Sequence, residues 1–213
     1  PGVQVKEIDL TNVVPSVSTT TGAMAGSFAW GVVNEVVTVS SETELVNTFG
    51  KPDANTYESV LTAAQFLSYG SALKVVRAVG SSALNARIGS GAVLTQNKTV
   101  FDGQTTVAAN WAQARYPGVT GNAVGIAYQT DPTSTTAWIT SNTEGLPGTS
   151  AGATAVGGSN DEIHVLVYDA DGTITGAVDT ILETWTYLSQ ASDVKSSDGS
   201  SLYYKDVINA GSK

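Results

Sequence analysis

The sequence predicts an α+β protein that combines a helix–helix–strand unit with a longer β-rich segment. In residues 41–80, helix caps, helical spacing of apolar residues and glycine stops agree over forty positions. Residues 93–187 instead contain short apolar segments separated by turn residues, which is typical of a β-rich module. We expect this second segment to be antiparallel and barrel- or sandwich-like, with the helices confined mainly to the first unit.

The first ten residues, PGVQVKEIDL, are predicted to be extended. Val3 and Val5 share one face of a strand, whereas Ile8 and Leu10 have the opposite parity, so we expect a bulge or break near Glu7. A short terminal strand of this kind either pairs with its own sheet or adds to the edge of a neighbouring sheet. The residues themselves leave both alternatives open.

A Thr- and Ser-rich connector over residues 11–22 leads toward a second predicted strand over residues 36–39. Ser41, with Glu44 three residues later, then forms a capping box at the start of a helix. Gly50 ends this helix, because glycine readily adopts the backbone conformation that follows a helix.

A second helix follows, with Asn55 or Thr56 as its cap and Gly70 at its end. Residues 73–79 are predicted to form a strand after it. The residues expected to line the apolar face of this helix are Tyr57, Val60, Leu61, Ala64 and Leu67.

The sequence from Gly80 onward is rich in glycine and small polar residues and contains several candidate strands. Asp171 and Gly172 are a hairpin signal. Residues 140–161 have almost no large apolar side chains and are predicted to form a long exposed loop; residues 179–192 are ambiguous, and residues 202–213 are helix-like. The apolar segments expected as strands are Val93–Leu94, Val100–Phe101, Val124 to Tyr128, Trp138–Ile139, Ile163–Tyr168 and Thr173–Ile174.

The composition excludes several classes of function. The net charge is −9, with 10 basic and 19 acidic residues, so the chain is a poor partner for nucleic acid or an anionic membrane surface. With no cysteine, it can hold neither a disulfide nor a thiolate metal site. No apolar run approaches the roughly 20 residues that span a bilayer. We expect no cofactor and no metal.

Gly148–Gly152 reads G-x-S-x-G, the pattern around the nucleophile of many hydrolases. That motif works where a core strand delivers the serine onto a turn before a helix, and neither flank of Ser150 has that character. The single histidine, His164, and the nearest preceding acid, Asp161, lie so close together that a triad would require the chain to fold back on one strand. We therefore expect a loop here and predict that the protein is not an enzyme.

Two further segments resemble ligand sites without completing them. Asp169–Gly172 looks like the start of a calcium loop, but the position that needs a bidentate Glu is Thr180. Residues 115–122 look like a phosphate cradle but lack the Gly-Lys-Ser/Thr end and precede a strand. Turns explain both segments better, and His164 is expected to be a structural strand residue.

Six short segments run in order from end to end of the chain. They are Pro1-Gly2-Val3 with Val5 and Glu7, Gly26-x-x-x-Trp30-Gly31, residues 44–50 (ELVNTFG), residues 66–70 (FLSYG) with Leu73-x-Val75-Val76-Arg77-Ala78-Val79, residues 114–118 (ARYPG) with Gly121-Asn122, and residues 203–209 (YYKDVIN). Taken together and in this order, these segments resemble the tail sheath proteins of contractile-tailed bacteriophages, most closely the T-even-like ones.

This resemblance implies a structural protein of the virion tail, assembled in the host cytoplasm. Family members polymerise as stacked six-subunit rings around a tail tube, and contraction of that lattice drives the tube through the host envelope. Their terminal arms add strands to neighbouring sheets, so residues 1–8 look like the N-terminal arm, with Val3, Val5 and Ile8 as the candidate subunit contacts. The implied partners are other sheath subunits, the tube and the baseplate.

The resemblance also implies a domain organisation. Residues 1–90 would hold the arm and part of the sheath core, residues 91–185 an inserted outward-facing β-rich domain, and residues 186–213 a return to the core. Family members continue for hundreds of residues, so the chain looks like an N-terminal fragment, expected to be monomeric by itself.

Two other functions were considered from the residues. One is a glycan- or surface-binding module that uses Trp111, Trp138 and Tyr128 on one exposed face. The other is a hydrolase that uses Ser150. A contractile bacteriocin or secretion sheath would be a close variant of the favoured interpretation.

Overall fold

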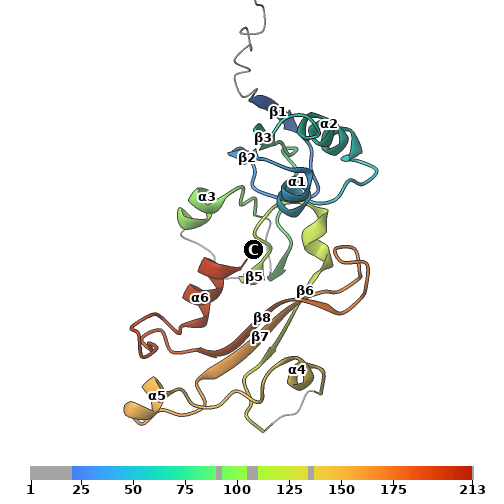
Figure 1. Cartoon of the computed structure of the whole chain (residues 1–213). Helices are drawn as coiled ribbons and strands as arrows, with labels where there is room; N and C mark the ends of the chain where they lie inside the picture. Colours follow the sequence, from blue (N-terminus) through green and yellow to red (C-terminus); the bar gives the residue numbers. More distant parts are fainter. Residues whose placement is uncertain (1–20, 90–92, 105–109, 134–136, 213) are drawn as a thin grey trace, which may run out of the picture. The chain divides into compact units, whose positions relative to one another are not determined.

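The computed structural model describes residues 21–89, 93–104, 110–133 and 137–212 (Figure 1). The chain forms two compact units, Pro1–Gly80 and Ser81–Lys213. Both helices and sheets occur in each, and the sheets of the described residues are open, with no closed barrel among them. The predicted α+β class is confirmed.

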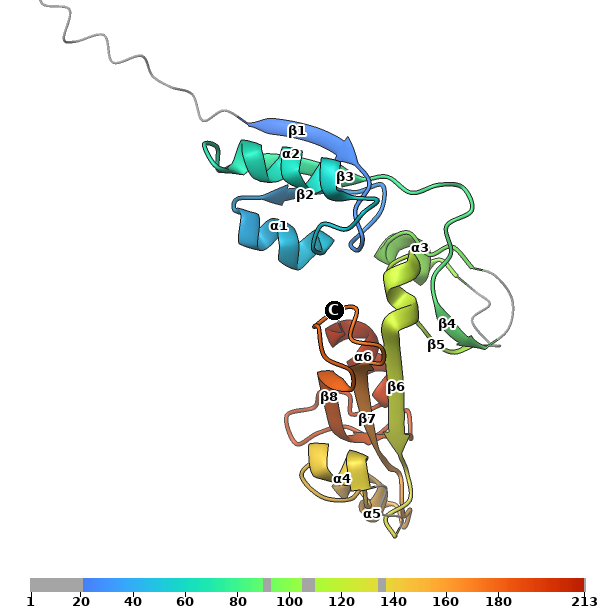
Figure 2. The same cartoon turned by 90° about the vertical axis from the view of Figure 1, so that its right-hand side faces the viewer.

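Unit 1, residues 1–80, contains a three-stranded mixed sheet in the order β1-β3-β2. Strand β1 (Gly22–Gly26) runs parallel to β3 (Leu73–Arg77), and β2 (Val36–Val39) runs antiparallel to β3. Figure 2 shows the three strands with the helices of this unit beside them. The strand predicted over residues 73–79 is confirmed, although it ends at Arg77.

Helix α1 (Glu42–Phe49) begins as its sequence predicts. Ser41 Oγ accepts a hydrogen bond from Glu44 N at 3.2 Å, which is one half of the capping box. The carboxylate of Glu44 instead bonds Ser40, the residue before the cap, and accepts from Ser40 N at 2.8 Å and from Ser40 Oγ at 2.6 Å. These two bonds hold the pKa of Glu44 below its usual value. Gly50 ends the helix with φ 88°.

Helix α2 (Tyr57–Leu67) is capped at Thr56, one of the two predicted positions. Its buried residues are Val60 and Ala63, so the predicted apolar face is partly wrong. Tyr57 and Leu61 are exposed, because the helix is rotated to pack Val60 and Ala63 on the sheet. The core of unit 1 consists of Phe28, Val39, Leu45, Phe49, Val60, Ala63, Leu73 and Val75.

The loop between β1 and β2 is held by a buried arginine. Arg77 donates from Nε to Phe28 O at 3.0 Å and from Nη1 to Gly31 O at 2.7 Å. Burial lowers the pKa of Arg77 to about 10, so the guanidinium stays charged at neutral pH. Backbone carbonyls thus compensate a buried cation within this loop.

Unit 2 begins with a two-stranded sheet of β4 (Arg87–Gly89) and β5 (Asn110–Gln113). Beside this sheet, Asn85 is buried and bonds the chain at three points, through Thr95 N, Thr95 O and Ala114 O. A short helix, α3 (Lys98–Asp102), is capped by Asn97. A 3₁₀ helix, η1 (Val119–Ala123), then leads into the main sheet.

The main sheet of unit 2 is antiparallel, in the order β6-β7-β8. Its strands are β6 (Val124–Gln129), β7 (Glu162–Asp169) and β8 (Thr180–Ser189), so the strands predicted near Val124 and Ile163 are confirmed. The ambiguous residues 179–192 contain β8, which is the longest strand among the described residues. A Cβ at Gly125 would lie 2.4 Å from the Tyr168 ring, so glycine allows this ring to cross β6.

Helix α6 (Tyr204–Gly211) covers one face of this sheet, as the helix-like end of the sequence predicts. Its Tyr204, Val207 and Ile208 pack against a buried cluster on β7 and β8. That cluster consists of Ile163, Val165 and Leu188, with Ile126 and Trp185 beside it. The helix is therefore amphipathic, and its apolar side is already occupied.

Several predicted strands are wrong. Val93–Leu94 is irregular, Val100–Phe101 lies in α3, and Thr173–Ile174 lies in the loop between β7 and β8. Trp138–Ile139 lies in helix α4 (Ala137–Asn142), where the Trp138 ring packs edge-on against Tyr168, with centroids 4.9 Å apart. Pairs of adjacent apolar residues are too short to define a period, so tertiary packing decided their conformation.

The predicted long exposed loop at residues 140–161 is also wrong. It contains the end of α4 and helix α5 (Ala151–Ala155), and Pro147, Ser150 and Ala153 are buried. Small side chains made the segment look exposed, but small residues also allow close packing.

Candidate subunit-contact surface

The predicted subunit contacts Val3, Val5 and Ile8 lie outside the described residues, so their role stays a prediction. The described residues begin at Thr21, immediately before β1, which is an edge strand of the described sheet. Within the described residues, β1 pairs only with β3. Among the described residues, the other edge of β1 has no partner strand, which is the feature that strand addition uses.

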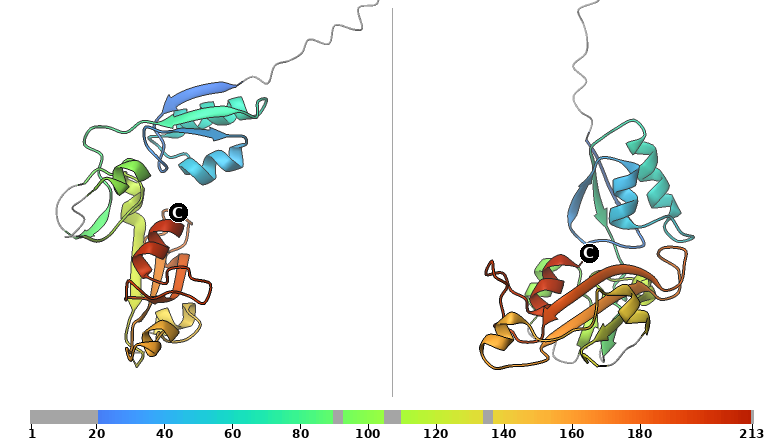
Figure 3. Two further views of the ribbon diagram at one scale, coloured as in Figure 1. Left: turned by 90° about the vertical axis from the view of Figure 1, so that its left-hand side faces the viewer. Right: turned by 60° about the horizontal axis from the view of Figure 1, so that its bottom comes forward.

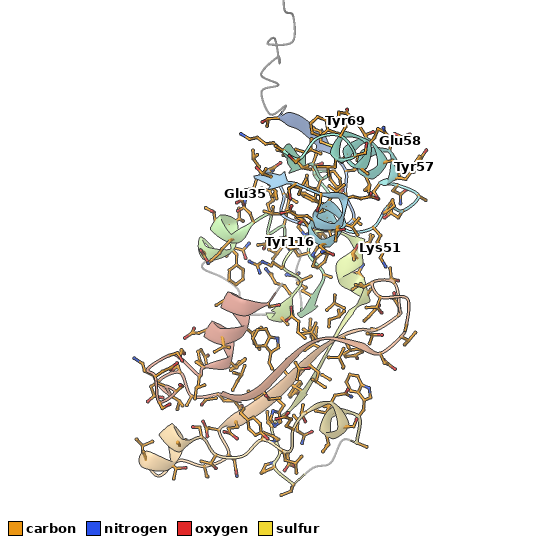
Figure 4. The ribbon with its side chains drawn as sticks, viewed as in Figure 1. Glu35, Lys51, Tyr57, Glu58, Tyr69 and Tyr116 are labelled. Carbon is orange, nitrogen blue, oxygen red and sulfur yellow. The ribbon has the colours of Figure 1, made fainter. Side chains whose placement is uncertain are left out.

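Helix α2 and the turn after it present an exposed row that we call the α2 ridge: Tyr57, Leu61 and Gln65 in the helix, and Tyr69 in the turn. These residues recur every four positions and so line up along the chain. Leu61 is 58% exposed and Tyr69 is 74% exposed. Figure 4 shows Tyr57 and Tyr69 on the outside of α2, with Glu58 beside them. Exposed aromatic and aliphatic residues in one row are typical of a protein contact.

An open, mainly apolar groove of about 640 Å³ lies between the α2 ridge and β1. Phe66 forms part of its wall and contacts Tyr69 edge-on, with centroids 5.4 Å apart. A Cβ on Gly22 would lie 2.6 Å from the Phe66 ring, so a glycine is required where β1 enters the groove. The lining residues are Gly22, Ala23, Met24, Leu61, Thr62, Gln65, Phe66, Tyr69 and Leu73. The groove is therefore an open, mainly apolar depression beside β1, the edge strand of the described sheet.

Ser150 of the G-x-S-x-G motif, and Asp161, make contacts that stabilise the fold. Ser150 Oγ donates to Asp161 at 2.8 Å and accepts from Ala153 N at 3.1 Å, so it caps α5. Asp161 also accepts from Ser150 N and from Ser189 Oγ. Burial opposes ionisation of Asp161, but these bonds outweigh burial and lower its pKa. The serine and the acid are brought together directly, without an intervening imidazole.

His164 is buried on β7 and lies against Tyr187 of β8. Tyr187 N donates to His164 Nδ1 at 3.1 Å, and the two rings meet edge-on with centroids 4.6 Å apart. Burial lowers the pKa of His164, although the Leu146 carbonyl and the Glu162 charge oppose this shift. The prediction of a structural strand histidine agrees with these contacts.

The segment that resembled a calcium loop is a capped turn. Asp169 accepts from Gly172 N, Ile174 N, Thr175 N and Thr175 Oγ1, at 2.7 to 3.0 Å. Burial alone would raise the pKa of Asp169, but these bonds outweigh it and hold the pKa below its usual value. The described residues contain no group of three or more His, Cys, Asp or Glu side chains placed to hold a metal.

Residues 115–122 enter the 3₁₀ helix η1 and then β6. Gly118 has φ 130° and its N–H bonds Leu84 O, while Arg115 donates to Ser212 O. The segment therefore leads into strand β6, as predicted. Of its two predicted turns, Pro117-Gly118 precedes η1 and Gly121-Asn122 lies within it. In the described ranges, no helix is long and apolar enough to cross a membrane.

The comparisons with known proteins now give these surfaces a context. The family described as "Tail sheath protein Gp18 domain III N-terminal region" matches residues 19–78. The chain is 46% identical to the tail sheath protein of Enterobacteria phage T4 over 79 residues, which are 37% of this chain and 12% of that protein. It is 35% identical to the tail sheath protein of Salmonella phage ViI over 185 residues, which are 85% of this chain and 27% of that protein.

The structural match to the sheath tail protein Lin1278 from Listeria innocua covers 84% of this chain and 28% of the Lin1278 chain, with 14% sequence identity and a TM-score of 0.42. This likeness is too weak to add to the sequence matches. The chain thus corresponds to about a quarter of the length of the ViI protein, and to less of the T4 protein.

Proposed function

We propose, since this chain is a homologue of phage tail sheath proteins over most of its residues, that it is part of a structural subunit of a contractile tail sheath. The observation that carries the proposal is the 35% identity to a tail sheath protein over 85% of the chain. The proposed work is mechanical and is done at contacts between copies. The comparisons do not favour a glycan-binding module, and the relatives are structural proteins.

In the proposed mechanism, subunits polymerise around a tail tube in an extended, metastable lattice. Contraction remakes the contacts between rings and drives the tube through the host envelope, while exchanged strands keep neighbours tethered. The subunit would act in the virion tail, after assembly in the host cytoplasm, with tube and baseplate as further partners. In the whole protein, residues 91–185 would face outward and residues 186–213 would return to the core.

The N-terminal arm is the proposed tether. Val3, Val5 and Ile8 would contact a neighbouring subunit, because an extended segment with alternating apolar residues fits an open strand edge flanked by pockets. The position of β1 at the edge of the described sheet, beside an apolar groove, supports this assignment. Backbone hydrogen bonds would give affinity, and the apolar side chains would set the register.

Deleting residues 1–10 from the whole sheath protein tests this assignment. We expect the circular dichroism spectrum and melting temperature of the subunit to persist while electron microscopy shows no ordered sheath. The double variant Val3→Asp with Val5→Asp should act like the deletion. Gln4→Asp should assemble normally, because in an extended arm residue 4 would face away from the side of residues 3 and 5. Normal sheaths from the deletion would refute the arm.

The 213-residue chain alone is expected to be a monomer in light scattering, since sheath contacts would also need regions that the relatives carry elsewhere. Ordered tubes from this chain would show that those regions are dispensable.

A further inference from the structure

The main sheet of unit 2 has its histidine on the face opposite α6. Side chains alternate along β7, so His164 and Tyr168 face away from the side on which Ile163 and Val165 pack beneath α6. The second face is covered by the segment with α4 and α5, where Trp138 packs on Tyr168. Figure 3 shows this segment and α6 on opposite sides of the sheet. His164 lies in this second layer with only 1% of its surface exposed.

A bulge in β8 lies directly opposite His164. The register of β7 with β8 shifts between Ile163 and Val165. His164 therefore faces two residues of β8, Thr186 and Tyr187, which is the arrangement of a β-bulge. Tyr187 has φ 55°, a left-handed conformation that is strained for a bulky residue. A strained residue persists only where its neighbours hold it in place.

The imidazole of His164 provides the acceptor that holds this bulge. Tyr187 N donates to His164 Nδ1 at 3.1 Å. Because Nδ1 accepts this bond, the neutral ring holds its proton on Nε2. His164 Nε2 is buried without a well-formed hydrogen bond to any described residue, and the Leu146 carbonyl only partly compensates it. The bulge thus depends on an acceptor that becomes a donor when the ring is protonated.

The same tyrosine fastens the loop that joins α4 to α5, residues 143–150, which we call the α4–α5 loop. Tyr187 Oη donates to the Glu144 carbonyl. A Cβ on Gly145, which has φ 115°, would lie 3.0 Å from the same hydroxyl. Glu144 and Gly145 are exposed, whereas Pro147 is fully buried. The first half of the loop, residues 144–147, is therefore tied to the tyrosine that His164 positions.

Carboxylates hold the second half of the α4–α5 loop. Gly148 N donates to Glu162 at 2.8 Å, and both Ser150 N and Ser150 Oγ donate to Asp161 at 2.8 Å. Burial raises the pKa of Asp161, but its hydrogen bonds, led by the one from Ser189, outweigh burial and lower it. This carboxylate therefore stays ionised in the pH range in which histidine titrates. One end of the loop depends on an imidazole and the other on a carboxylate.

We propose that His164 is an acid-sensitive anchor, whose protonation shifts residues 144–147 toward an open state while residues 148–153 stay in place. A protonated Nδ1 would direct an N–H donor at the N–H donor of Tyr187, so the ring must leave the bulge. Tyr187 can then relax from its left-handed conformation and release the Glu144 carbonyl. The proposal rests on the fold of unit 2 and does not depend on the proposed sheath function.

The groups around His164 set the sign of this response. Burial lowers the pKa of His164, and the Leu146 carbonyl and the Glu162 charge oppose this shift only in part. The open state, with the usual histidine pKa of about 6.5, therefore binds the proton first as the pH falls. Helices α4 and α5 contain no titratable residue, and the β6 residue opposite His164 is the uncharged Gln129. The titratable neighbours are Glu162 on β7, Tyr187 on β8 and the exposed Glu144 in the loop.

Hydrogen exchange of the 213-residue chain tests the proposal, with rates expressed as protection factors to remove the intrinsic effect of pH. One proton bound on opening raises the opening constant by up to about tenfold between pH 7.5 and 5.5. Protection of the Tyr187 amide should therefore fall by up to about tenfold, whereas the amides of Ser150 and Ala153 should keep theirs. Because His164 is the only histidine, ¹⁵N-histidine NMR reports its tautomer directly and should show the proton on Nε2 at pH 7.5.

Thiol labelling reports the loop itself, since the chain has no cysteine of its own. Leu146→Cys places a thiol in the first half of the loop, and Ala151→Cys places an exposed reference thiol just after the second half. The labelling rate of Leu146→Cys relative to Ala151→Cys should rise as the pH falls, by the same factor as the exchange at Tyr187. Relative to Ala151→Cys, an unchanged rate would show that the loop does not follow the bulge and would overturn the proposal.

Two substitutions separate the anchor from its tie to the loop. His164→Gln keeps an acceptor that does not titrate, so protection at residue 187 should become independent of pH. Tyr187→Phe removes only the bond to the Glu144 carbonyl, so the loop should be open at both pH values while the residue-187 amide keeps its pH dependence. Constant protection of Tyr187 in the unsubstituted chain would refute the proposal. An equal loss at Ser150 and Ala153 would also refute it, because the whole unit would then be opening.

Discussion

The interior of unit 1 and the interior of unit 2 are stabilised by different interactions. The core of unit 1 is a continuous apolar cluster in which the rings of Phe28 and Phe49 lie 4.8 Å apart, and its only buried charge, among the described residues, is Arg77. Unit 2 has a smaller apolar cluster and buries many hydrogen-bonded polar side chains. These are Asn85, Thr95, Gln129, Ser150, His164, Asp169 and Ser189.

The difference teaches where each unit is vulnerable. Unit 1 depends on apolar volume, which is insensitive to pH, and it has an open groove beside β1. Unit 2 depends on polar partners, each of which is costly to lose once buried. The match to the sheath family over residues 19–78 lies wholly in unit 1. The match to the ViI protein covers 85% of the chain and therefore extends into unit 2 as well.

The largest expected effect is in the core of unit 1. Phe49→Ala should destabilise unit 1 by about 3–5 kcal/mol, because it removes a fully buried ring and leaves a cavity. Hydrogen exchange of the β3 amides should accelerate while that of β7 stays unchanged. Tyr69→Ala is the control and should alter stability by no more than about 0.5 kcal/mol, as the side chain is mainly exposed. Equal acceleration in both units would contradict their separate stabilisation.

The counterpart in unit 2 is Asp169→Asn. One amide oxygen cannot replace a carboxylate that accepts four hydrogen bonds, so the loop after β7 should open. Exchange at Ile174 and Thr175 should rise, and β1 to β3 should keep their protection. Asp171→Asn, on an exposed neighbour, should change little beyond Thr173. An unaltered loop in Asp169→Asn would show that the carboxylate is not its anchor.

A smaller effect is expected at the start of α1. Ser41→Ala should cost unit 1 about 0.5–2 kcal/mol, because the Glu44 N–H loses its side-chain acceptor. Urea denaturation followed by circular dichroism would measure this loss. Ser68→Ala, which changes an exposed serine at the C-terminal end of a different helix, α2, serves as the reference and should cost less.

The smallest effect sharpens the comparison by pH. The folded-state pKa of His164 is lowered, so below about pH 6.5, the usual value for histidine, the unfolded chain binds a proton that the folded unit 2 resists. Unit 2 should therefore lose stability as the pH falls from 7.5 to 5.5, while unit 1, which has no histidine, should not.

His164→Gln should flatten the pH dependence of unit 2 in this range, since the glutamine oxygen can accept from Tyr187 N without titrating. Thermal unfolding at several pH values would measure it. A pH dependence that survives this substitution would assign the titration to other groups.

The sequence predicts the fold of unit 1 better than the fold of unit 2. In unit 1 the signals were local: α1 lies between Ser41 and Gly50, and Thr56 is the N-cap position of α2, so both helices were predicted correctly. The rotation of α2 was missed because Leu61 fits an apolar stripe as well as Ala63 does, and only packing on the sheet separates them.

In unit 2 the decisive contacts join residues distant in sequence. Asp161 reaches Ser189 across 28 positions, and Tyr187 reaches the Glu144 carbonyl across 43 positions. Nothing in the composition of residues 140–161 indicates that these bonds fold the segment onto the sheet. The candidate contact surface could not be predicted from the sequence either, because the groove beside β1 depends on which side of α2 faces the sheet.

The most direct test of the proposed function is cryo-electron microscopy of the sheath assembled from the whole protein. The account predicts that density for residues 3–8 of one subunit lies as an added strand on a sheet edge of its neighbour, with Val3, Val5 and Ile8 against that neighbour's side chains. Density showing this segment paired within its own subunit, or making no contact with any neighbour, would contradict it.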